Sequence, residues 1–519
     1  MTRHRDWLWA ALICLPVVLF YLAHWALTQQ GFGWTGFVQY DQLYYMANAR
    51  EIVDRGGWLT YGNPFSPDPA TSAIYFQPVT MVLAALLRLT GGDPAVVYLG
   101  LGAVAMLGCA RSIIALFRRA VPQRDAGSAV GLILFAWGGG VLVFAGLIVG
   151  KVLNDFDPIR FDPGGGFWFL SLGRNLIFPL EALNHLFFFG AVLLVIARRW
   201  PAATAMAALL SASHPFTGIE LLGILLGWAV FERLFMKNRS IPAWFIATLA
   251  ALMMAHAGYY LAFLPLDPEH RELFDQWRVF EANGSLLTMV LAYGPVALIA
   301  ALRLWRDRIR ATFANPQERL FALWFAGAFV LSNNNLFMDP IQPLHFSRGY
   351  VWTPLFLLGA PWLVRELRQG LASPRSSLSV LVFAALMLLD NLVWLGVTAH
   401  KSPGIFLNAD ERSFLAWLDQ SQHANAVLLA DDRLAYAATA YSPVRGWFTH
   451  RFNTPSAQQR EAELRAFMAT GTLAPAMAGR NLIVVRDAAR RLNPQVVPTG
   501  AQLVYRSDSI SAWRLAGPR

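Results

Sequence analysis

The sequence predicts a mainly α-helical, polytopic membrane protein, a bundle of about eleven transmembrane helices with a small extramembrane α/β domain at the C-terminal end. Three observations lead to this fold class. The chain is 56% hydrophobic and only 14% charged, whereas soluble proteins carry about 25% charged residues. Its mean hydropathy of +0.42 comes from repeated apolar runs of about 20 residues, the length that crosses a bilayer. These runs stop near residue 400, where a soluble pattern begins.

The first apolar segment, residues 7–27, follows the basic start Arg3-His4-Arg5. It is too long for the apolar part of a signal peptide, and no small-residue cleavage pattern follows it, so we expect a retained signal anchor. The two cysteines, Cys14 and Cys109, lie in apolar segments. We therefore expect neither a disulfide framework nor a thiolate metal site.

A long polar connection, residues 28–93, follows the first segment and organises the chain. It is rich in tyrosine, tryptophan and proline and ordinary in charge, which argues against disorder. Connections of this length are usually functional when they are ordered. Asp41 stands before a predicted helix over 42–53. The apolar stretch 78–90 has a length that fits a juxtamembrane or re-entrant helix better than a span.

Eleven apolar segments are long enough, or nearly so, to be membrane helices, and two of them are short for a bilayer of about 30 Å. They are residues 7–27, 94–117, 127–149, 176–197, 201–213, 215–235, 241–264, 285–303, 318–332, 347–365 and 377–399.

The distribution of arginine and lysine supports this count. With the N-terminus in the cytoplasm, every basic cluster outside the C-terminal tail falls on the inner side, as the positive-inside rule requires. A full span at 78–90 would turn the later clusters outward. The clusters are Arg118, Arg119 and Arg124; Arg198 and Arg199; Arg233, Lys237 and Arg239; Arg303, Arg306, Arg308 and Arg310; and Arg365, Arg368 and Arg375. The net charge of +10 is thus a topology signal, and we expect no nucleic-acid partner.

Residues 401–519 read as a separate periplasmic α/β domain, and residues 1–400 as the transmembrane domain. The domain has neither a glycine-rich phosphate loop nor a metal-ligand spacing. The predicted helices cover 409–420 and 456–469, and the predicted strands cover 427–430, 482–485, 503–506 and 511–515.

Ionisable and polar residues gather on the outer connections or just inside the helices that follow them. Charged groups at membrane depth are costly and tend to mark function. The candidates are Asp41, Asp155, Asp157, Arg174, His214, Glu220, Gln342, His345 and Arg348.

Each candidate also has a purely structural interpretation. Asp41 would suit the N-cap of the following helix, and Asp155 and Asp157 suit turns before proline. The remaining structural roles are an interfacial arginine for Arg174, a helix cap or packed ring for His214, a paired carboxylate for Glu220, and interface anchors for His345 and Arg348. The aromatic residues of the loop would also suit an interfacial belt.

Together these features resemble the GT-C superfamily of integral membrane glycosyltransferases. The resemblance rests on the topology of residues 1–400, on Tyr40-Asp41-Gln42 followed by Tyr44-Tyr45, on Phe76-Gln77-Pro78 before a short apolar segment, and on the later His345 and Arg348. It implies a hexosyl- or pentosyltransferase that uses a sugar carried on polyprenyl phosphate. By resemblance Asp41 is the catalytic carboxylate, and Tyr44 and Gln77 contact substrate.

The chain departs from the family pattern at two places. Gln42 stands where many members have a second acidic residue, and Gln77 stands where many have a lysine before the prolines. The pair Asp155-Phe156-Asp157 resembles the second acidic motif of metal-dependent oligosaccharyltransferases. This pair is the candidate site for a divalent cation, magnesium or manganese.

Elementary chemistry leads to the same roles. A lipid phosphate is a good leaving group, so the reaction needs a base for the acceptor hydroxyl and cations for the departing phosphate. Asp41 is the candidate base, and Arg348 is the first candidate for the phosphate because its planar fork matches phosphate oxygens. His345, His214 and Arg174 rank second. We expect inversion at the anomeric carbon, because no second carboxylate stands ready as a nucleophile.

Two other classes stay open. A transporter or flippase of a lipid-linked substrate would use buried Glu181, His185 and Glu220 as coupling groups. A non-catalytic assembly partner would use the outer α/β domain for docking. For the enzyme we expect a bacterial inner membrane, a cytoplasmic N-terminus and a periplasmic active face, with a glycan, a lipid or a protein as acceptor.

Overall fold

The computed structural model describes residues 2–163, 170–278, 285–401 and 404–515. The chain divides into two compact units, each assembled from three separate stretches of sequence. The first unit comprises Met1–Ala23, Gly102–Gly258 and Phe280–Lys401, and the second comprises His24–Leu101, Tyr259–Val279 and Ser402–Arg519.

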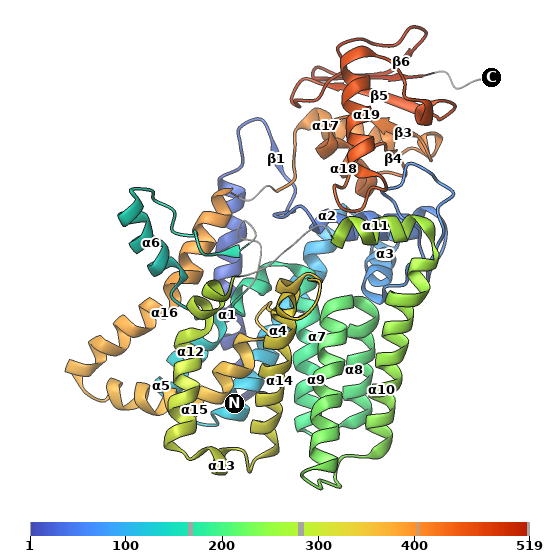
Figure 1. The fold of residues 1–519 in the computed structure, drawn as a ribbon. Helices are drawn as coiled ribbons and strands as arrows, with labels where there is room; N and C mark the ends of the chain where they lie inside the picture. The colour runs from blue at the N-terminus through green and yellow to red at the C-terminus, as the bar shows by residue number, and fades with distance from the viewer. Residues whose placement is uncertain (1, 164–169, 279–284, 402–403, 516–519) are drawn as a thin grey trace. The chain divides into compact units, whose positions relative to one another are not determined.

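The first unit is a bundle of apolar helices (Figure 1). Within it α15 lies against α5, α12, α14 and α16, and most of its residues are buried. Helices α7, α8, α9 and α10 follow one another side by side. The helices that lie wholly or mostly in this unit are α1 (Thr2–Ala26), α4 (Pro94–Ala120), α5 (Ala126–Trp137), α6 (Leu142–Leu153), α7 (Pro179–Ile196), α8 (Trp200–Ser213), α9 (Pro215–Leu234), α10 (Ala243–Ala257), α12 (Leu286–Arg306), α13 (Ile309–Thr312), α14 (Pro316–Ser332), α15 (Trp352–Leu371) and α16 (Pro374–Lys401).

The chain is a multi-pass membrane protein of the predicted class, but fewer helices qualify as spans than the eleven expected. Among the described residues seven helices are long and apolar enough to cross a membrane, or up to eight if one bent pair is a single span. Helices α8 and α14 are helical where predicted but have only 14 and 17 residues. Helix α15 carries Arg365, Glu366 and Arg368 in its last turns.

The third predicted span is broken, which corrects the expectation of one continuous helix over 127–149. Its halves, α5 and α6, meet at an angle of 63°. The cause is the run Gly138-Gly139-Gly140, since glycine is a poor helix former. The new end of α6 is capped from α16: Asp390 accepts hydrogen bonds from the backbone N–H groups of Leu142 at 3.0 Å and Val143 at 2.9 Å. A carboxylate at a helix N-terminus satisfies donors that the break leaves open.

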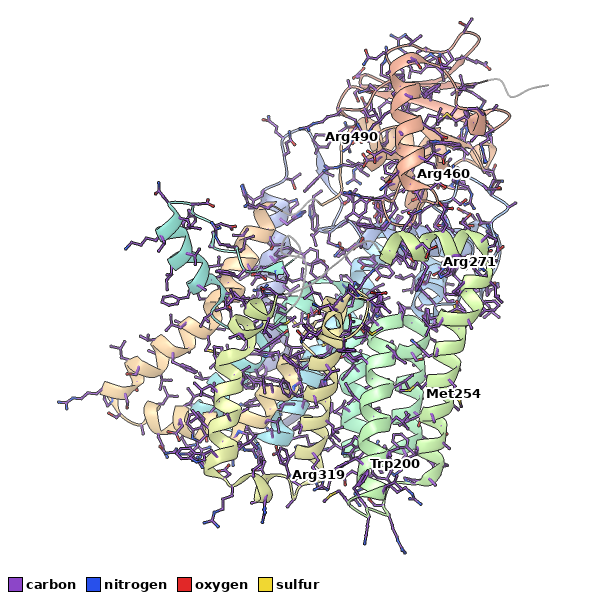
Figure 2. The ribbon with its side chains drawn as sticks, in the orientation of Figure 1. Trp200, Met254, Arg271, Arg319, Arg460 and Arg490 are labelled. Atoms are coloured by element: carbon purple, nitrogen blue, oxygen red, sulfur yellow. The ribbon has the colours of Figure 1, made fainter. Side chains whose placement is uncertain are left out.

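Buried ion pairs connect helices of this unit. Arg319, at the start of α14 (Figure 2), pairs with Glu232 of α9, with Nε 2.5 Å from Oε1. Arg303 of α12 donates to both carboxylate oxygens of Glu318. Removing one partner of such a pair would leave a buried charge without its counter-charge, which is strongly destabilising.

The second unit joins the long polar connection to the C-terminal residues. Strand β1 (Gly33–Trp34) pairs antiparallel with β2 (Phe406–Leu407). Helix α2 (Gln42–Asp54) lies against α3 (Pro78–Thr90) and against α18 (Asp432–Tyr441). Helix α3 is the predicted short apolar helix. The other helices of the unit are α11 (Pro268–Arg278), α17 (Ala409–Leu418) and α19 (Ala457–Thr470).

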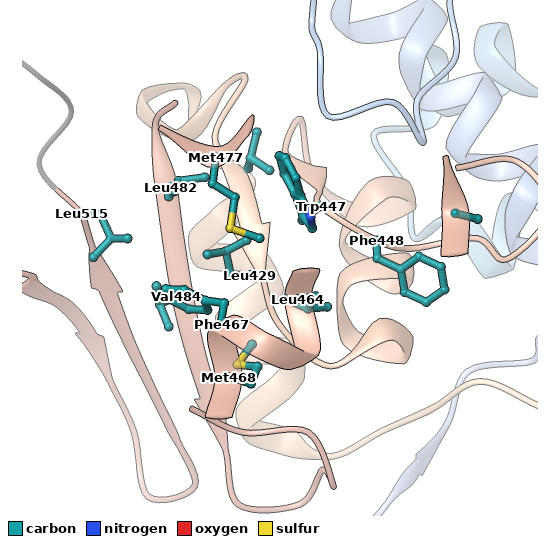
Figure 3. Packing of buried hydrophobic residues seen from close by; sticks show 12 residues of the cluster. Leu429, Trp447, Phe448, Leu464, Phe467, Met468, Met477, Leu482, Val484 and Leu515 are labelled. Atoms are coloured by element: carbon teal, nitrogen blue, oxygen red, sulfur yellow. The ribbon is translucent and has the colours of Figure 1, made fainter. Parts of the chain in front are cut away.

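A five-stranded sheet, ordered β4-β3-β5-β7-β6, forms the C-terminal part of this unit. Strand β3 is parallel to β4 and β5, while β7 is antiparallel to β5 and β6. Figure 3 shows Phe467 and Met468 of α19 packed with Leu482 and Val484 of β5. The strands are β3 (Val427–Leu429), β4 (Arg445–Gly446), β5 (Leu482–Asp487), β6 (Gln502–Arg506) and β7 (Ile510–Arg514). The predicted strands and helices of this region are confirmed; α18 and β4 were not predicted.

Candidate functional site

Asp41 lies directly before α2, in the second unit. It occupies the N-cap position, but its side chain makes no capping hydrogen bond to the helix. Instead, Gln39 donates from Nε2 to Oδ2 at 2.9 Å, and Nε2 of His450 lies 3.5 Å from Oδ1. The Asp41 side chain is 55% exposed. The carboxylate therefore accepts a hydrogen bond at one oxygen, has the His450 ring near the other, and is still open to solvent.

An aromatic cluster surrounds the His450 ring, formed by Tyr40, Tyr44, Phe65 and Tyr436. Their ring centroids lie 4.9, 5.8, 5.3 and 5.2 Å from that of His450. Burial raises the pKa of Tyr40 and Tyr436, and the Asp41 carboxylate adds to this effect. Both phenols are consequently neutral hydrogen-bond donors at physiological pH.

The structure places the two remaining first-loop candidates differently. Tyr44 belongs to the aromatic cluster beside Asp41, and its ring stacks on Phe65 at 5.5 Å. Gln77 precedes α3, where its Oε1 accepts hydrogen bonds from Tyr61 at 2.9 Å and Thr80 at 3.0 Å. Within the second unit Gln77 thus organises the start of α3.

The first unit contains a separate buried cluster around Arg348. The Arg348 guanidinium pairs with the carboxylate of Glu181 in α7, and it donates to Nδ1 of His345 at 2.9 Å. Burial, reinforced by the Arg348 charge and by His214, lowers the pKa of His345 well below its usual range. His345 is therefore neutral, and because Nδ1 accepts from Arg348, its proton is on Nε2.

His214 and Glu220 belong to the same region of the first unit. His214 caps α9 by accepting from the backbone N–H of Thr217 at 3.1 Å, and its ring lies 6.2 Å from that of His345. Glu220 is fully buried one turn and a half further along α9. Among the described residues its two carboxylate oxygens have no hydrogen-bond partner.

Arg174 is committed to structural contacts in the first unit. Its side chain is 1% exposed, and Nη1 lies 2.5 Å from Oδ1 of Asp162. Its Nε donates to Asn391 at 2.6 Å, and its guanidinium lies over the ring of Trp394. The sequence identified this arginine as a candidate, but its buried pairing with Asp162 was not predicted.

Asp155 and Asp157 do not gather a donor set for a divalent cation. Asp155 pairs with Arg160 at 2.6 Å, and Asp157 accepts from the backbone N–H of Ile159. In the part of the chain that the structure describes, no group of three or more histidine, cysteine, aspartate or glutamate side chains is placed to hold a metal ion. A cation needs several oxygen ligands converging at 2.0–2.6 Å, roughly, so these two residues fit the role poorly.

Sequence comparison finds no relative: no protein-family model matches the chain, and no curated protein sequence is significantly similar to it. Structure comparison does. The apo oligosaccharyltransferase of Archaeoglobus fulgidus matches with a TM-score of 0.53 and 11% sequence identity, over 92% of this chain and 70% of that chain. The chain has a GT-C fold.

A second structure of the same archaeal GT-C enzyme, AglB in complex with an inhibitory peptide and a dolichol-phosphate, matches with a TM-score of 0.51 and 12% identity, over 92% of this chain and 69% of that one. ArnT from Cupriavidus metallidurans bound to undecaprenyl phosphate is 14% identical over 98% of this chain and 99% of that one, with a TM-score of 0.47. At 11% and 12% identity the two archaeal structures show likeness in fold alone, and the predicted resemblance is confirmed at that level.

Two residues near Asp41 were not predicted as parts of the site. Gln39 lies in the same polar run, and its donor amide two residues before an aspartate is a weak local signal. His450 lies 409 residues further along the chain in Phe448-Thr449-His450-Arg451-Phe452. No motif spacing connects it to Asp41, so only the folded chain reveals the pair.

Proposed function

We propose that this protein is an inverting membrane glycosyltransferase. It moves a hexosyl or pentosyl group from a polyprenyl-phosphate carrier to a glycan, lipid or protein acceptor of the cell envelope, at the periplasmic face of a bacterial inner membrane. The observation that carries the proposal is the Asp41 carboxylate, 55% exposed and held by Gln39 and His450 before α2. The GT-C fold supports it, since an enzyme with this fold has been solved with dolichol-phosphate.

In the proposed reaction Asp41 accepts the proton of the acceptor hydroxyl. The acceptor oxygen forms a bond to the anomeric carbon from the face opposite the phosphate. The bond between that carbon and the phosphate oxygen breaks, and its electron pair leaves with the lipid phosphate. A positioned general base of this kind contributes about 10²–10⁴-fold to a rate.

Arg348 and His345 are the proposed phosphate-binding residues. The Arg348 guanidinium has donors in a planar fork that suits phosphate oxygens. Neutral His345 carries its proton on Nε2, as its contact with Arg348 requires, and that N–H is a further donor. Glu181 balances the arginine charge in the absence of phosphate. His214 and Glu220 complete the surroundings of this pair within the first unit.

Asp155 and Asp157 carry no step in this proposal because their donor set fits a cation poorly. Gln77 and Arg174 have structural partners. We therefore assign Gln77 to positioning the start of α3, and Arg174 to the buried ion pair with Asp162. Tyr44 contributes an aromatic ring beside Asp41, a surface on which a sugar ring packs.

The test is a transfer assay with the purified full-length chain and a panel of undecaprenyl-phosphate-linked sugars, with released undecaprenyl phosphate as the readout. We expect Asp41→Asn to lower the rate by roughly 100-fold or more. Asp68→Asn is the matched control, since it removes an exposed carboxylate from the same loop. Parallel reactions with a chelator test the cation.

Each outcome decides a part of the proposal. Equal rates for wild type and Asp41→Asn would remove Asp41 from the mechanism. Loss of transfer activity in the presence of the chelator would support Asp155 and Asp157 as ligands of a divalent cation. Substrate-dependent flux across vesicles, without sugar transfer, would favour a transporter and overturn the enzyme assignment.

A further inference from the structure

We propose that His450, supplied by the C-terminal α/β region, is a positioning residue for the Asp41 carboxylate. The inference deepens the proposed function and rests on it. His450 lies in the turn after β4, and only 2% of its side chain is exposed. Its Nε2 atom points to Oδ1 of Asp41 at 3.5 Å. The contact depends on which ring nitrogen carries the proton and on the bonds that hold the ring in place.

The hydrogen bonds of the other ring nitrogen fix the tautomer. The backbone N–H of Phe452 donates to Nδ1 of His450 at 3.1 Å. The amide nitrogen of Asn453 lies closer to Nδ1, at 3.0 Å, than to Nε2, at 3.3 Å. A donated hydrogen bond from this amide to Nδ1 also requires that Nδ1 carry no hydrogen. A neutral imidazole that accepts at Nδ1 carries its hydrogen on Nε2. The ring therefore presents an N–H to Asp41.

The turn that carries His450 is bound to the residue before Asp41. The Tyr40 hydroxyl donates to the carbonyl of Thr449 at 3.2 Å and accepts from the backbone N–H of Arg451 at 3.2 Å. These two bonds bracket His450. The Tyr436 hydroxyl donates to the carbonyl of Tyr40 at 3.0 Å. Movement of the histidine relative to Asp41 would thus break several hydrogen bonds at once.

The same turn has further anchors on two other elements. Trp277 of α11 donates from Nε1 to the carbonyl of Phe452 at 2.6 Å. Asn63 of the first loop donates to the carbonyl of Asn453 at 3.0 Å. The hydroxyl of Thr454 accepts from the backbone N–H of His450 at 3.1 Å. The position of His450 is consequently fixed by its surroundings and does not depend on Asp41.

The role follows from this geometry. Gln39 donates to Oδ2 and His450 faces Oδ1, so each carboxylate oxygen has one of these two side chains beside it. The distance of 3.5 Å is longer than an ordinary hydrogen bond, and such contacts often shorten when substrate binds. His450 touches no reacting atom: it orients the base and stabilises its charged form before the proton is accepted.

Two substitutions separate positioning from packing. His450→Phe keeps an aromatic ring and its packing but removes the N–H, together with the Nδ1 acceptor of Phe452 and Asn453. His450→Gln loses the ring but places an amide donor close to the position of Nε2. If His450 positions Asp41, kcat/KM for undecaprenyl-phosphate sugars falls by roughly 10-fold in His450→Phe, and the decrease is in kcat. In His450→Gln most of the activity is restored. His423→Phe, another buried histidine beside an aromatic ring of the same sheet region, is the control that leaves kcat/KM unchanged.

A second readout needs no substrate. Mass spectrometry of the full-length protein after treatment with a carbodiimide and an amine measures the labelling rate of the Asp41 carboxylate. Without the His450 N–H, Asp41 is expected to react about 2- to 10-fold faster in His450→Phe, and at the wild-type rate in His450→Gln.

The outcomes separate this inference from the function it rests on. Full activity of Asp41→Asn would overturn the proposed function, while the labelling rates would still test the contact. An inactive Asp41→Asn together with wild-type activity and labelling in His450→Phe would overturn the role of His450 alone. Activity that survives in His450→Phe but fails in His450→Gln would show that the ring serves packing only.

Discussion

At the scale of single residues, the two proposed centres differ in how their charge is held. Asp41 is 55% exposed and faces the side chains of Gln39 and His450. Arg348 has a side chain only 10% exposed and is paired with a carboxylate, Glu181. An exposed base can meet an acceptor directly. A buried arginine is fixed in place, and removing it would leave the Glu181 charge uncompensated.

A lysine at position 348 tests the arginine without removing the charge. The ammonium of Arg348→Lys lacks the planar fork, so we expect the KM for the lipid-linked donor to rise about 10-fold or more. Steady-state kinetics with an undecaprenyl-phosphate sugar measures this change. A variant with wild-type KM would contradict a phosphate role.

Arg319→Lys is the matched control for that experiment. It makes the same substitution in another buried arginine–glutamate pair, between α14 and α9. Both variants are expected to lose thermal stability, whereas only Arg348→Lys changes KM. An equal rise in KM for both would mean that the effect comes from general loosening of the bundle.

At the scale of elements, the break between α5 and α6 shows how a bent span is stabilised. The backbone of Gly139 donates to the carbonyl of Met387 in α16 at 2.7 Å, and that of Val141 donates to the carbonyl of Leu291 in α12 at 2.9 Å. Asp390 then caps α6. Backbone groups cannot stay unpaired in an apolar environment, so neighbouring helices supply the partners that the break removes.

At the break, the backbone of Gly140 lies close to the backbone of α12. A Cβ atom on Gly140 would lie 2.0 Å from the carbonyl oxygen of Leu291 and 2.5 Å from that of Ala292. We expect Gly140→Ala to destabilise the protein by roughly 1–3 kcal/mol, as overpacking does, and to lower the melting temperature in detergent.

The control is Gly396→Ala in α16, where, among the described residues, no atom outside the helix's own backbone lies within 4 Å of the added Cβ. This variant is expected to be neutral or slightly stabilising, because alanine is the better helix former. If the two variants melted together, the tight contact at Gly140 would not be present in the protein.

At the scale of the whole molecule, one ion pair joins distant parts of the sequence within the second unit. Arg445 of β4 donates to both carboxylate oxygens of Glu51 in α2, at 2.8 and 3.0 Å. It also donates to the carbonyls of Asn63 and Ser66 in the first loop. The arginine side chain is 6% exposed. Every bond joins the long first connection to the C-terminal sheet.

Loss of this arginine is expected to loosen the first connection. Arg445→Ala removes one of the two arginines paired with the buried Glu51 carboxylate and leaves Arg55 in place, so the cost is expected to stay below the roughly 3–5 kcal/mol of a buried charge left without any partner. Limited proteolysis followed by mass spectrometry should show faster cleavage within residues 28–93, together with a lower melting temperature.

Arg465→Ala serves as the comparison for that variant. Arg465 pairs with Glu461 on the surface of α19, and its side chain is 65% exposed. Such pairs contribute about 0–1 kcal/mol, so cleavage should proceed as in the wild type. Identical cleavage of the two variants would show that the Arg445 network does not hold the loop.

The sequence predicted most of the fold because membrane helices and sheet strands leave strong local patterns. Apolar runs located the helices, and short runs of apolar, mostly β-branched residues located strands such as β5. The break in the third span was not predicted, since its apolar pattern continues through Gly138-Gly139-Gly140. Helix α18, a ten-residue helix that follows β3 closely, was also missed.

The candidate site was less predictable because it depends on contacts between distant residues. Asp41 stood out through its position after the first apolar segment. Arg348 and His345 stood out as ionisable residues near a membrane surface, but the pairing with Glu181 and the resulting tautomer of His345 are visible only in the folded chain. His450 had no local signal, since a histidine between aromatic residues is usually a packed core residue.

The Arg445–Glu51 pair also sets an order of events during synthesis. Its members are 394 residues apart, so a ribosome working at about 5–20 residues per second completes Arg445 some 20–80 s after Glu51. Throughout that interval neither Arg445 nor His450 has been synthesised, so the segment that carries Asp41 lacks the contacts with both residues. Maturation of the proposed catalytic carboxylate would then be among the last steps of biogenesis, and a prematurely terminated chain would insert into the membrane without becoming active.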